Sequence, residues 1–189
     1  MCLLQLEANC RNCLPVVEKV NRILGGVLMA VVKSNHDTKE IQIVVFKLGD
    51  ESFASDIHPV KEIRRVDEIT PVPQAPNFVE GIISLRGQIY PIIDLGKRFG
   101  QNAKELTNDS RIILIDLPEA QYGMIVDSVM EVQRVKIEDI EEAPELVTRG
   151  TRKFLEGVVK KDNKLILLID VEQILTEGEK KELKQADIS

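Results

Sequence analysis

Two stretches of the chain, FVEGIISLRGQIYPIIDL (78–95) and FLEGVVKKDNKLILLIDV (154–171), match one another without a gap at an offset of 76 residues. Both begin with Phe-x-Glu-Gly and end on Ile-Asp followed by an apolar residue. A second offset, of 69 residues, places Ile43–Val66 over Ile112–Val135, again without a gap. Identical pairs at a common offset indicate an internal duplication rather than chance similarity.

Each copy contains a late hairpin. In the first copy Gly81–Leu85 turns at Arg86-Gly87, and in the second copy Gly157–Val159 turns just before Lys164–Asp170. Short β-branched runs between turn residues predict strands. Closing such strands into barrels would remove their open edges. We therefore expect an all-β fold in which 41–175 holds two small antiparallel barrels, with repeat 1 over about 41–99 and repeat 2 over about 110–175.

Three local expectations follow from the same patterns. Pro91 within a strand predicts an edge position or a bulge. The apolar run Leu165–Ile169 predicts a strand buried on both faces. Beyond the second repeat, 176–189 is expected to be a short C-terminal helix, interrupted at Gly178, or a solvated tail.

The first 40 residues differ from the rest and are expected to be a leader and a mobile lead-in. They hold all three cysteines, Cys2, Cys10 and Cys13. A Cys-x-x-Cys pair could be half a zinc site or a redox pair, but His36 and His58 are poorly spaced to complete a metal site. We expect these cysteines to have no metal role. A ribosome-recruiting sequence could be encoded just before Met29, so translation is expected to begin there and 1–28 to be absent from the native protein.

Composition excludes several classes of function. The 189 residues carry 25 Lys+Arg and 31 Asp+Glu, a net charge of −6, which disfavours binding to nucleic-acid phosphates. Five Phe, two Tyr and no Trp leave few side chains for stacking on bases. The longest apolar run, Ile23–Val32, is too short for a membrane span, which needs about 20 residues. No nucleophile–base pair, phosphate loop or metal motif can be assembled, so we expect neither an enzyme nor a cofactor.

A binding module remains, and Arg86 is its first candidate residue. The second copy has Asp162 at the equivalent hairpin tip, so the fold itself does not require an arginine there. Arginine forms bidentate hydrogen bonds with carboxylates and is enriched among interface anchors. Glu62 differs, because its repeat partner is also a glutamate, Glu131, and shared fold chemistry could explain both.

Four segments together resemble the CheW-like family of bacterial chemotaxis coupling proteins: Leu48–Glu51, Val60–Ile63, Phe78–Gly87 and Pro91–Leu95. The resemblance extends in order over about 41–175. It implies two SH3-like five-stranded β-barrel subdomains, partly intertwined, with a small core between them. It also implies a cytoplasmic adaptor without catalytic activity or cofactor.

The resemblance further implies two partners: the cytoplasmic tip of membrane chemoreceptors and the regulatory domain of a CheA-type histidine kinase, in membrane-associated receptor arrays without insertion into the membrane. Carried over position by position, receptor contact is expected at Ile57, Val60, Glu62, Gly81, Leu85 and Arg86. Kinase contact is expected at Glu145, Leu155 and Gly157. The two glycines could act through the backbone alone, because a Cβ there could distort the hairpin.

Three other readings remain open from the residues. The same fold could serve a receptor–kinase pathway other than chemotaxis. The chain could instead be a small β-barrel that binds a ligand, which a buried pocket with converging polar groups would support. A nucleic-acid-binding SH3- or OB-like barrel is disfavoured by charge and aromatic content.

Overall fold

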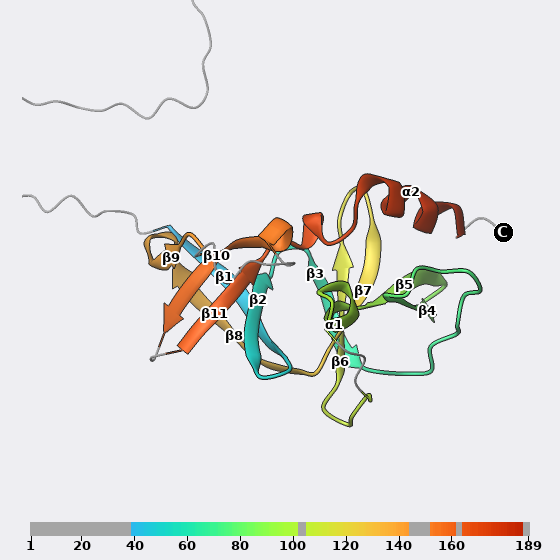
Figure 1. The fold of residues 1–189 in the computed structure, drawn as a ribbon, viewed down its shortest axis with the longest axis horizontal. Coiled ribbons are helices and arrows are strands. Elements are labelled where there is room, and N and C mark those ends of the chain that lie inside the picture. Colours follow the sequence, from blue (N-terminus) through green and yellow to red (C-terminus); the bar gives the residue numbers. More distant parts are fainter. Residues whose placement is uncertain (1–38, 102–104, 144–151, 162–163, 187–189) are drawn as a thin grey trace, which may run out of the picture. The chain divides into compact units, whose positions relative to one another are not determined.

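The computed structural model describes residues 39–101, 105–143, 152–161 and 164–186, and the expectations for 1–28, for the cysteines and for Asp162 fall outside these ranges. Most described residues form two β-sheets (Figure 1). Sheet A has the order β8-β1-β2-β11-β10-β9, and its strands are Ser128–Lys136, Glu40–Leu48, Glu51–Asp56, Lys164–Ile169, Leu155–Lys161 and Ile140–Glu141. Sheet B has the order β3-β6-β7-β5-β4, and its strands are Val60–Arg65, Arg111–Asp116, Gln121–Val126, Gln88–Asp94 and Val79–Leu85.

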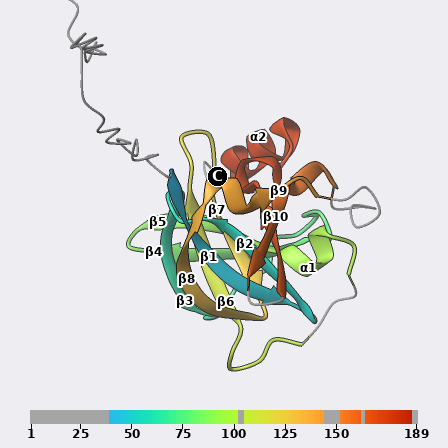
Figure 2. The same ribbon diagram turned by 90° about the vertical axis from the view of Figure 1, so that its left-hand side faces the viewer.

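The two repeats exchange their first hairpins. The β1–β2 hairpin of repeat 1 lies between β8 and β11 of repeat 2, and the β6–β7 hairpin of repeat 2 lies between β3 and β5 of repeat 1 (Figures 1 and 2). The registers obey the sequence offsets: Val44 pairs with Ser55 as Ile113 pairs with Met124. The expected duplication and the expected intertwining of strands are therefore both present.

No strand ladder closes either sheet into a ring. Instead, the chain following β3 bridges back to the open edge of β4, where Thr70 and Ile82 exchange two backbone hydrogen bonds of 2.9 and 2.8 Å. In sheet A the equivalent bridge is the short strand β9, which pairs with β10 through Glu141 and Val158. The two subdomains are thus curved sheets joined at their edges by short bridges, rather than the closed barrels that edge removal led us to expect.

The largest hydrophobic core lies between the sheets. Its buried members come from both sheets and from the segments that follow β5 and β11, and they include Phe46, Phe53, Ile113, Tyr122 and Phe154. Each sheet also encloses a smaller cluster of its own, around Ile43 in sheet A and around Tyr90 in sheet B. The expectation of a small core between the subdomains was therefore wrong. Strand exchange makes one face of every central strand part of the shared interior.

The repeated Ile-Asp pair begins a helical turn in each copy. The Asp94 carboxylate accepts a 3.0 Å hydrogen bond from the backbone N–H of Lys97 and caps α1 (Leu95–Arg98). Asp170 accepts one of 2.8 Å from the backbone N–H of Glu172 at the start of the 3-10 turn Val171–Gln173. A carboxylate at this position satisfies an N–H that has no partner within the helix.

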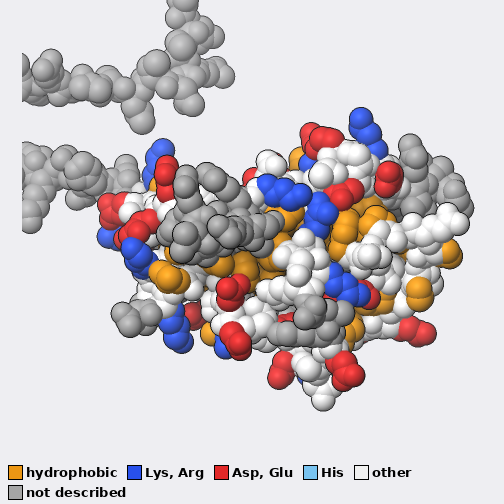
Figure 3. All heavy atoms as spheres, viewed as in Figure 1, with side chains coloured by type: hydrophobic (Ala, Val, Ile, Leu, Met, Phe, Trp, Pro, Cys, Tyr) orange, Lys and Arg blue, Asp and Glu red, His pale blue; other side chains and the backbone are white. Residues whose placement is uncertain are grey.

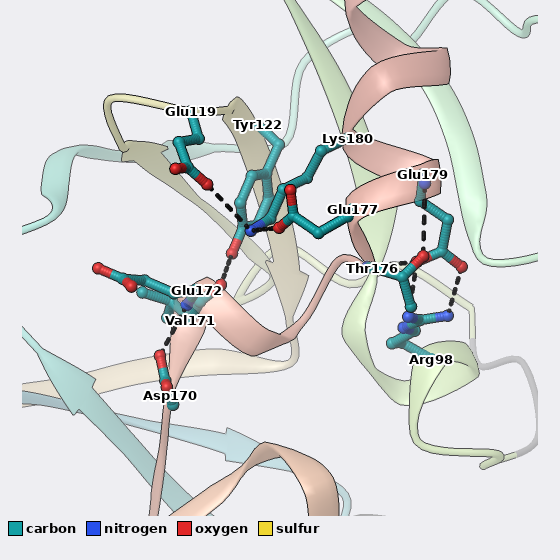
Figure 4. A network of polar contacts seen from close by, with 10 residues as sticks. All are labelled: Arg98, Glu119, Tyr122, Asp170, Val171, Glu172, Thr176, Glu177, Glu179 and Lys180. Carbon is teal, nitrogen blue, oxygen red and sulfur yellow. Dashed lines mark hydrogen bonds and ion pairs between the residues drawn. The ribbon is translucent and has the colours of Figure 1, made fainter.

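The C-terminal helix α2 (Glu177–Ala186) is attached to the fold by Arg98. The Arg98 guanidinium forms two hydrogen bonds to the Glu179 carboxylate, of 3.0 and 2.8 Å, and donates another to the carbonyl oxygen of Ile174 (Figure 4). It also lies over the rings of Phe78 and Phe154, one from each repeat. At the helix start, Glu179 accepts a 2.7 Å hydrogen bond from the backbone N–H of Thr176, as in a capping box.

Three local expectations need correction. Gly178 lies within α2 and does not interrupt it, because capping and the Arg98 contact secure that end of the helix. Leu165 is 59% exposed although the rest of its strand is mostly buried, because it stands at the outer end of the strand. Pro91 lies in β5, which is inside sheet B rather than at its edge. Its missing N–H costs no ladder bond there, because its partner Ile82 bonds to Thr70 instead and the β5–β7 ladder begins one residue later.

Candidate functional site

Arg86 stands at the tip of the β4–β5 hairpin, in a two-residue turn. Arg86 and Gly87 have φ angles of +52° and +81°, and Leu85 and Gln88 pair across the turn. Turns with two positive φ angles favour Asn, Asp and Gly, whereas a longer L side chain is strained there. The Arg86 side chain is 83% exposed. Neither the turn nor the core thus accounts for an arginine, and residues held in strain at the surface are often functional.

Glu62 lies beside Arg86 although their strands are opposite edges of sheet B. The guanidinium Nη2 of Arg86 is 3.8 Å from Oε2 of Glu62. An ion pair this long and exposed contributes little to stability, about 0–1 kcal/mol. The arrangement keeps a cation and a carboxylate side by side at the surface, so a partner can replace the pair with its own charges at little cost.

Lys61, which the sequence did not single out, holds β3 in place against the hairpin. Its Nζ donates a 2.9 Å hydrogen bond to the Tyr90 hydroxyl and lies 3.3 Å from Oε1 of Gln88 and 3.1 Å from Oδ2 of Asp116. The hydrogen bonds to Tyr90 and Asp116 raise the pKa of Lys61, and Lys61 lowers the pKa of Asp116. Comparison of the copies could have found this residue, because repeat 2 has Met130 at the same position.

The remaining residues of the expected receptor face are less accessible. Ile57 lies in the turn before β3, where its carbonyl oxygen accepts a 2.9 Å hydrogen bond from the N–H of Val60. Val60 packs against the shared core and Leu85 against the interior of sheet B. The structure thus places these residues around the Arg86–Glu62 pair as a half-buried apolar surround.

Gly81 has a structural reason to be glycine. Its φ is +150°, and a Cβ there would lie 2.1 Å from the carbonyl oxygen of Thr70, the residue that bridges to β4. Gly157 is its repeat equivalent, and a Cβ would lie 2.9 Å from the carbonyl oxygen of Glu141. The repeated Glu-Gly pair therefore marks the places where each sheet's bridging segment approaches the backbone most closely.

The expected kinase contacts lie on sheet A, apart from the receptor residues. Leu155 and Gly157 both belong to β10, where Leu155 is half-buried against the shared core. Glu145 lies outside the described residues. The structure therefore places the two expected binding faces on different sheets.

One further concentration of charge lies where β2, the β6–β7 turn and the start of β10 meet. A groove there is lined by His58 and by five carboxylates, those of Asp56, Asp116, Glu156, Asp170 and Glu172. Burial raises the pKa of Glu156, and the charges of Asp170 and Asp56 raise it further. His58 is exposed and 2.6 Å from the Asp56 carboxylate. Among the described residues, no three His, Cys, Asp or Glu side chains are arranged to hold a metal ion.

Charge over the rest of the described surface is mixed. On the face shown in Figure 3, lysines and arginines are interspersed with aspartates and glutamates. None of the described helices has the length and apolar character needed to cross a membrane.

Comparison with known proteins gives a consistent result. The family model for the CheW-like domain matches residues 42–179. The chemotaxis protein CheW of Treponema pallidum is 32% identical over 151 residues, which cover 77% of this chain and 88% of that protein. CheW of Bacillus subtilis is 35% identical over 134 residues, covering 71% and 86%.

A solved structure agrees with this assignment. The crystal structure of the scaffolding protein TtCheW from Thermoanaerobacter tengcongensis superposes with a TM-score of 0.69 at 40% identity, covering 75% of this chain and 97% of that one. Sequence and structure thus agree over the same two-sheet unit. The chain belongs to the CheW-like family, and it is a non-catalytic chemotaxis scaffolding protein.

Proposed function

We propose that this chain links the cytoplasmic tip of a chemoreceptor to the regulatory domain of a CheA-type histidine kinase, in the cytoplasm beside membrane-anchored receptor arrays. The observation that carries the proposal is Arg86: an 83% exposed arginine kept in a strained turn, with only a long ion pair to Glu62. A receptor carboxylate would form the short, bidentate contact with the guanidinium that Glu62 does not. The half-buried apolar residues around the pair would provide the dry surround that strengthens such an anchor.

The kinase would bind elsewhere, at the start of β10, through Leu155 and Gly157 and through Glu145. Two faces on different sheets allow both partners to be held at once. Tethering in this way turns a bimolecular encounter into a local one, which raises the effective concentration of each partner for the other. Receptor state would then shift the kinase between active and inactive populations, by as much as the adaptor's affinity for the two states differs.

The test measures binding of the full chain to two purified baits, a receptor cytoplasmic hairpin and a kinase regulatory domain, by calorimetry. Arg86→Asn is the informative variant, because asparagine suits the turn better than arginine and should leave stability equal or raise it by up to about 1 kcal/mol. We expect it to weaken receptor binding by about 1–3 kcal/mol and to leave kinase binding unchanged. Arg134→Asn, which removes another exposed arginine on β8, is the matched control and should affect neither.

Full receptor affinity in Arg86→Asn would refute the assigned anchor. If the wild-type chain bound neither bait while retaining its β-sheet spectrum, the coupling role itself would be refuted. The small ligand-binding barrel would then be the next function to test.

A further inference from the structure

The internal duplication relates two surface grooves, one on each sheet. The groove on sheet B has a volume of about 230 Å³ and is lined by Ile89 and Pro91 of β5 and by Glu119 in the β6–β7 turn. Applying the repeat offsets to these three residues gives Leu165, Leu167 and Asp50. Those three residues line a groove on sheet A with a volume of about 470 Å³. The two grooves are therefore the same feature of the fold, made once by each repeat.

In sheet B the groove is occupied by α2. Lys180 of α2 is 9% exposed, and its Nζ lies 3.7 Å from the Glu119 carboxylate and 2.7 Å from that of Glu177 (Figure 4). Leu183, three residues further on, also lines the groove and packs against the shared core. Residues three apart lie on the same face of a helix. The occupant of this groove is thus a short amphipathic helix with a lysine and a leucine on one face.

In sheet A no described helix occupies the groove. The helix α2 follows β11, whereas the chain following β5 continues into α1 and then into β6 at Arg111, so repeat 1 has no equivalent of α2 (Figure 1). Leu165 is 59% exposed and Met130, which also lines this groove, is 48% exposed. Asp50 has the position and charge sign of Glu119, the carboxylate that receives Lys180 in the other groove.

We propose that the groove on sheet A binds an amphipathic helix of a partner protein, in the way that the groove on sheet B binds α2. The partner helix presents a lysine to Asp50 and, three residues later, a leucine to Leu165 and Leu167. Lys47 and Lys164 also line the groove, so the helix carries an acidic residue on the flank that faces them. An apolar face laid into a groove, with charges fixing its direction, is a common mode of helix recognition.

The test uses a probe and needs neither receptor nor kinase, so its result is independent of the proposed coupling function. The probe is a fluorescein-labelled, side-chain-stapled helical peptide with the sequence of residues 176–186, titrated with the full chain by fluorescence anisotropy. We expect saturable binding, weakened about tenfold or more by Leu165→Glu, which places a charge on the apolar floor. Val132→Glu alters another exposed apolar residue of sheet A that does not line the groove, and it should leave binding unchanged.

Charge reversal tests the direction of the helix. Asp50→Lys should weaken binding of the probe, and a probe with glutamate in place of its Lys180-equivalent should recover affinity for that variant. Circular dichroism of each variant confirms that it is folded. A probe that does not bind saturably, or that binds Leu165→Glu as well as wild type, overturns the proposal.

Two alternative occupants have their own signatures. If the probe displaces the chain's own α2, Ile89→Glu will abolish binding and Leu165→Glu will not, which overturns the assignment to sheet A. If the true occupant is a second copy of the chain, sedimentation equilibrium will show a concentration-dependent mass that Leu165→Glu removes, and the partner helix is overturned.

Discussion

Replacing Gly81 by alanine is expected to be among the most damaging small substitutions in this chain. Its φ of +150° costs an L residue about 1–3 kcal/mol. The new Cβ would lie 2.1 Å from the carbonyl oxygen of Thr70, so the bridging segment must move away. That movement breaks the two backbone hydrogen bonds between Thr70 and Ile82, each contributing about 0.5–1.5 kcal/mol. The free energy of unfolding should therefore fall by about 2–6 kcal/mol in total.

The duplication supplies a matched control for this substitution. Gly157→Ala meets a methyl group of Ile140 at 2.6 Å and the carbonyl oxygen of Glu141 at 2.9 Å, without a positive φ. Because a side chain gives way more easily than backbone, we expect this variant to lose about 1–3 kcal/mol. Gly178→Ala meets nothing within 4 Å inside α2 and should stabilise the chain by about 0.5–1 kcal/mol.

Urea unfolding followed by circular dichroism gives these three free energies by linear extrapolation. A Gly81→Ala variant as stable as Gly157→Ala would refute the reasoning from the bridge and its backbone angle. The comparison also bears on the receptor face. If Gly81 acts only through the fold, any receptor affinity lost in Gly81→Ala should return when the variant is refolded by a stabilising osmolyte.

Two further predictions concern acidic groups. Burial by itself would raise the pKa of Glu179, but hydrogen bonds from Thr176 and the Arg98 guanidinium lower it, so its stabilising effect is present above the ordinary value of 4.5 and is lost as the pH falls through the lower folded value. Glu179→Gln should therefore destabilise the chain at pH 7, by less than about 1 kcal/mol because the group is partly exposed, and urea curves should converge with wild type near pH 3. Glu156 behaves in the opposite sense: its raised pKa favours the neutral form in the fold, so its contribution to stability is present below 4.5 and is lost as the pH rises through the raised value. Glu156→Gln should be slightly more stable than wild type at pH 7, and an equal advantage at acidic pH would contradict the assigned cause.

Much of the fold could be predicted because the two copies check one another. The Glu-Gly and Ile-Asp pairs were noticed only as repeated letters, yet each has a physical reason. Gly81 admits the bridging segment to β4, and Asp94 caps α1. Requirements of this kind are local, so they leave the same mark in both copies. The register followed for the same reason, because an offset that aligns the sequences also aligns the strand pairs.

The exchange of hairpins could not be derived from the residues and came only with the family resemblance. Two identical repeats offer identical edges, so pairing within a repeat and pairing between repeats satisfy the same pattern of apolar residues. The attachment of α2 was also missed. Its sequence is charged along its length, and only the fold shows that Arg98 and the groove on sheet B receive Glu179 and Lys180. For the binding face, the contrast between the copies at Arg86 was informative, whereas Lys61 was overlooked although it differs from its counterpart in the same way.

The exchange of hairpins has a consequence for how such a chain can be divided. A cut between α1 and β6 would give two halves, neither of which contains all the strands of one sheet. Each half would present open edges that only the other half, or a second copy of itself, could fill in the same register. The two halves, expressed separately, should therefore assemble into the native unit when mixed. A gene encoding a single repeat would yield a symmetric dimer with this same architecture, which makes the present chain equivalent to such a dimer joined by a linker.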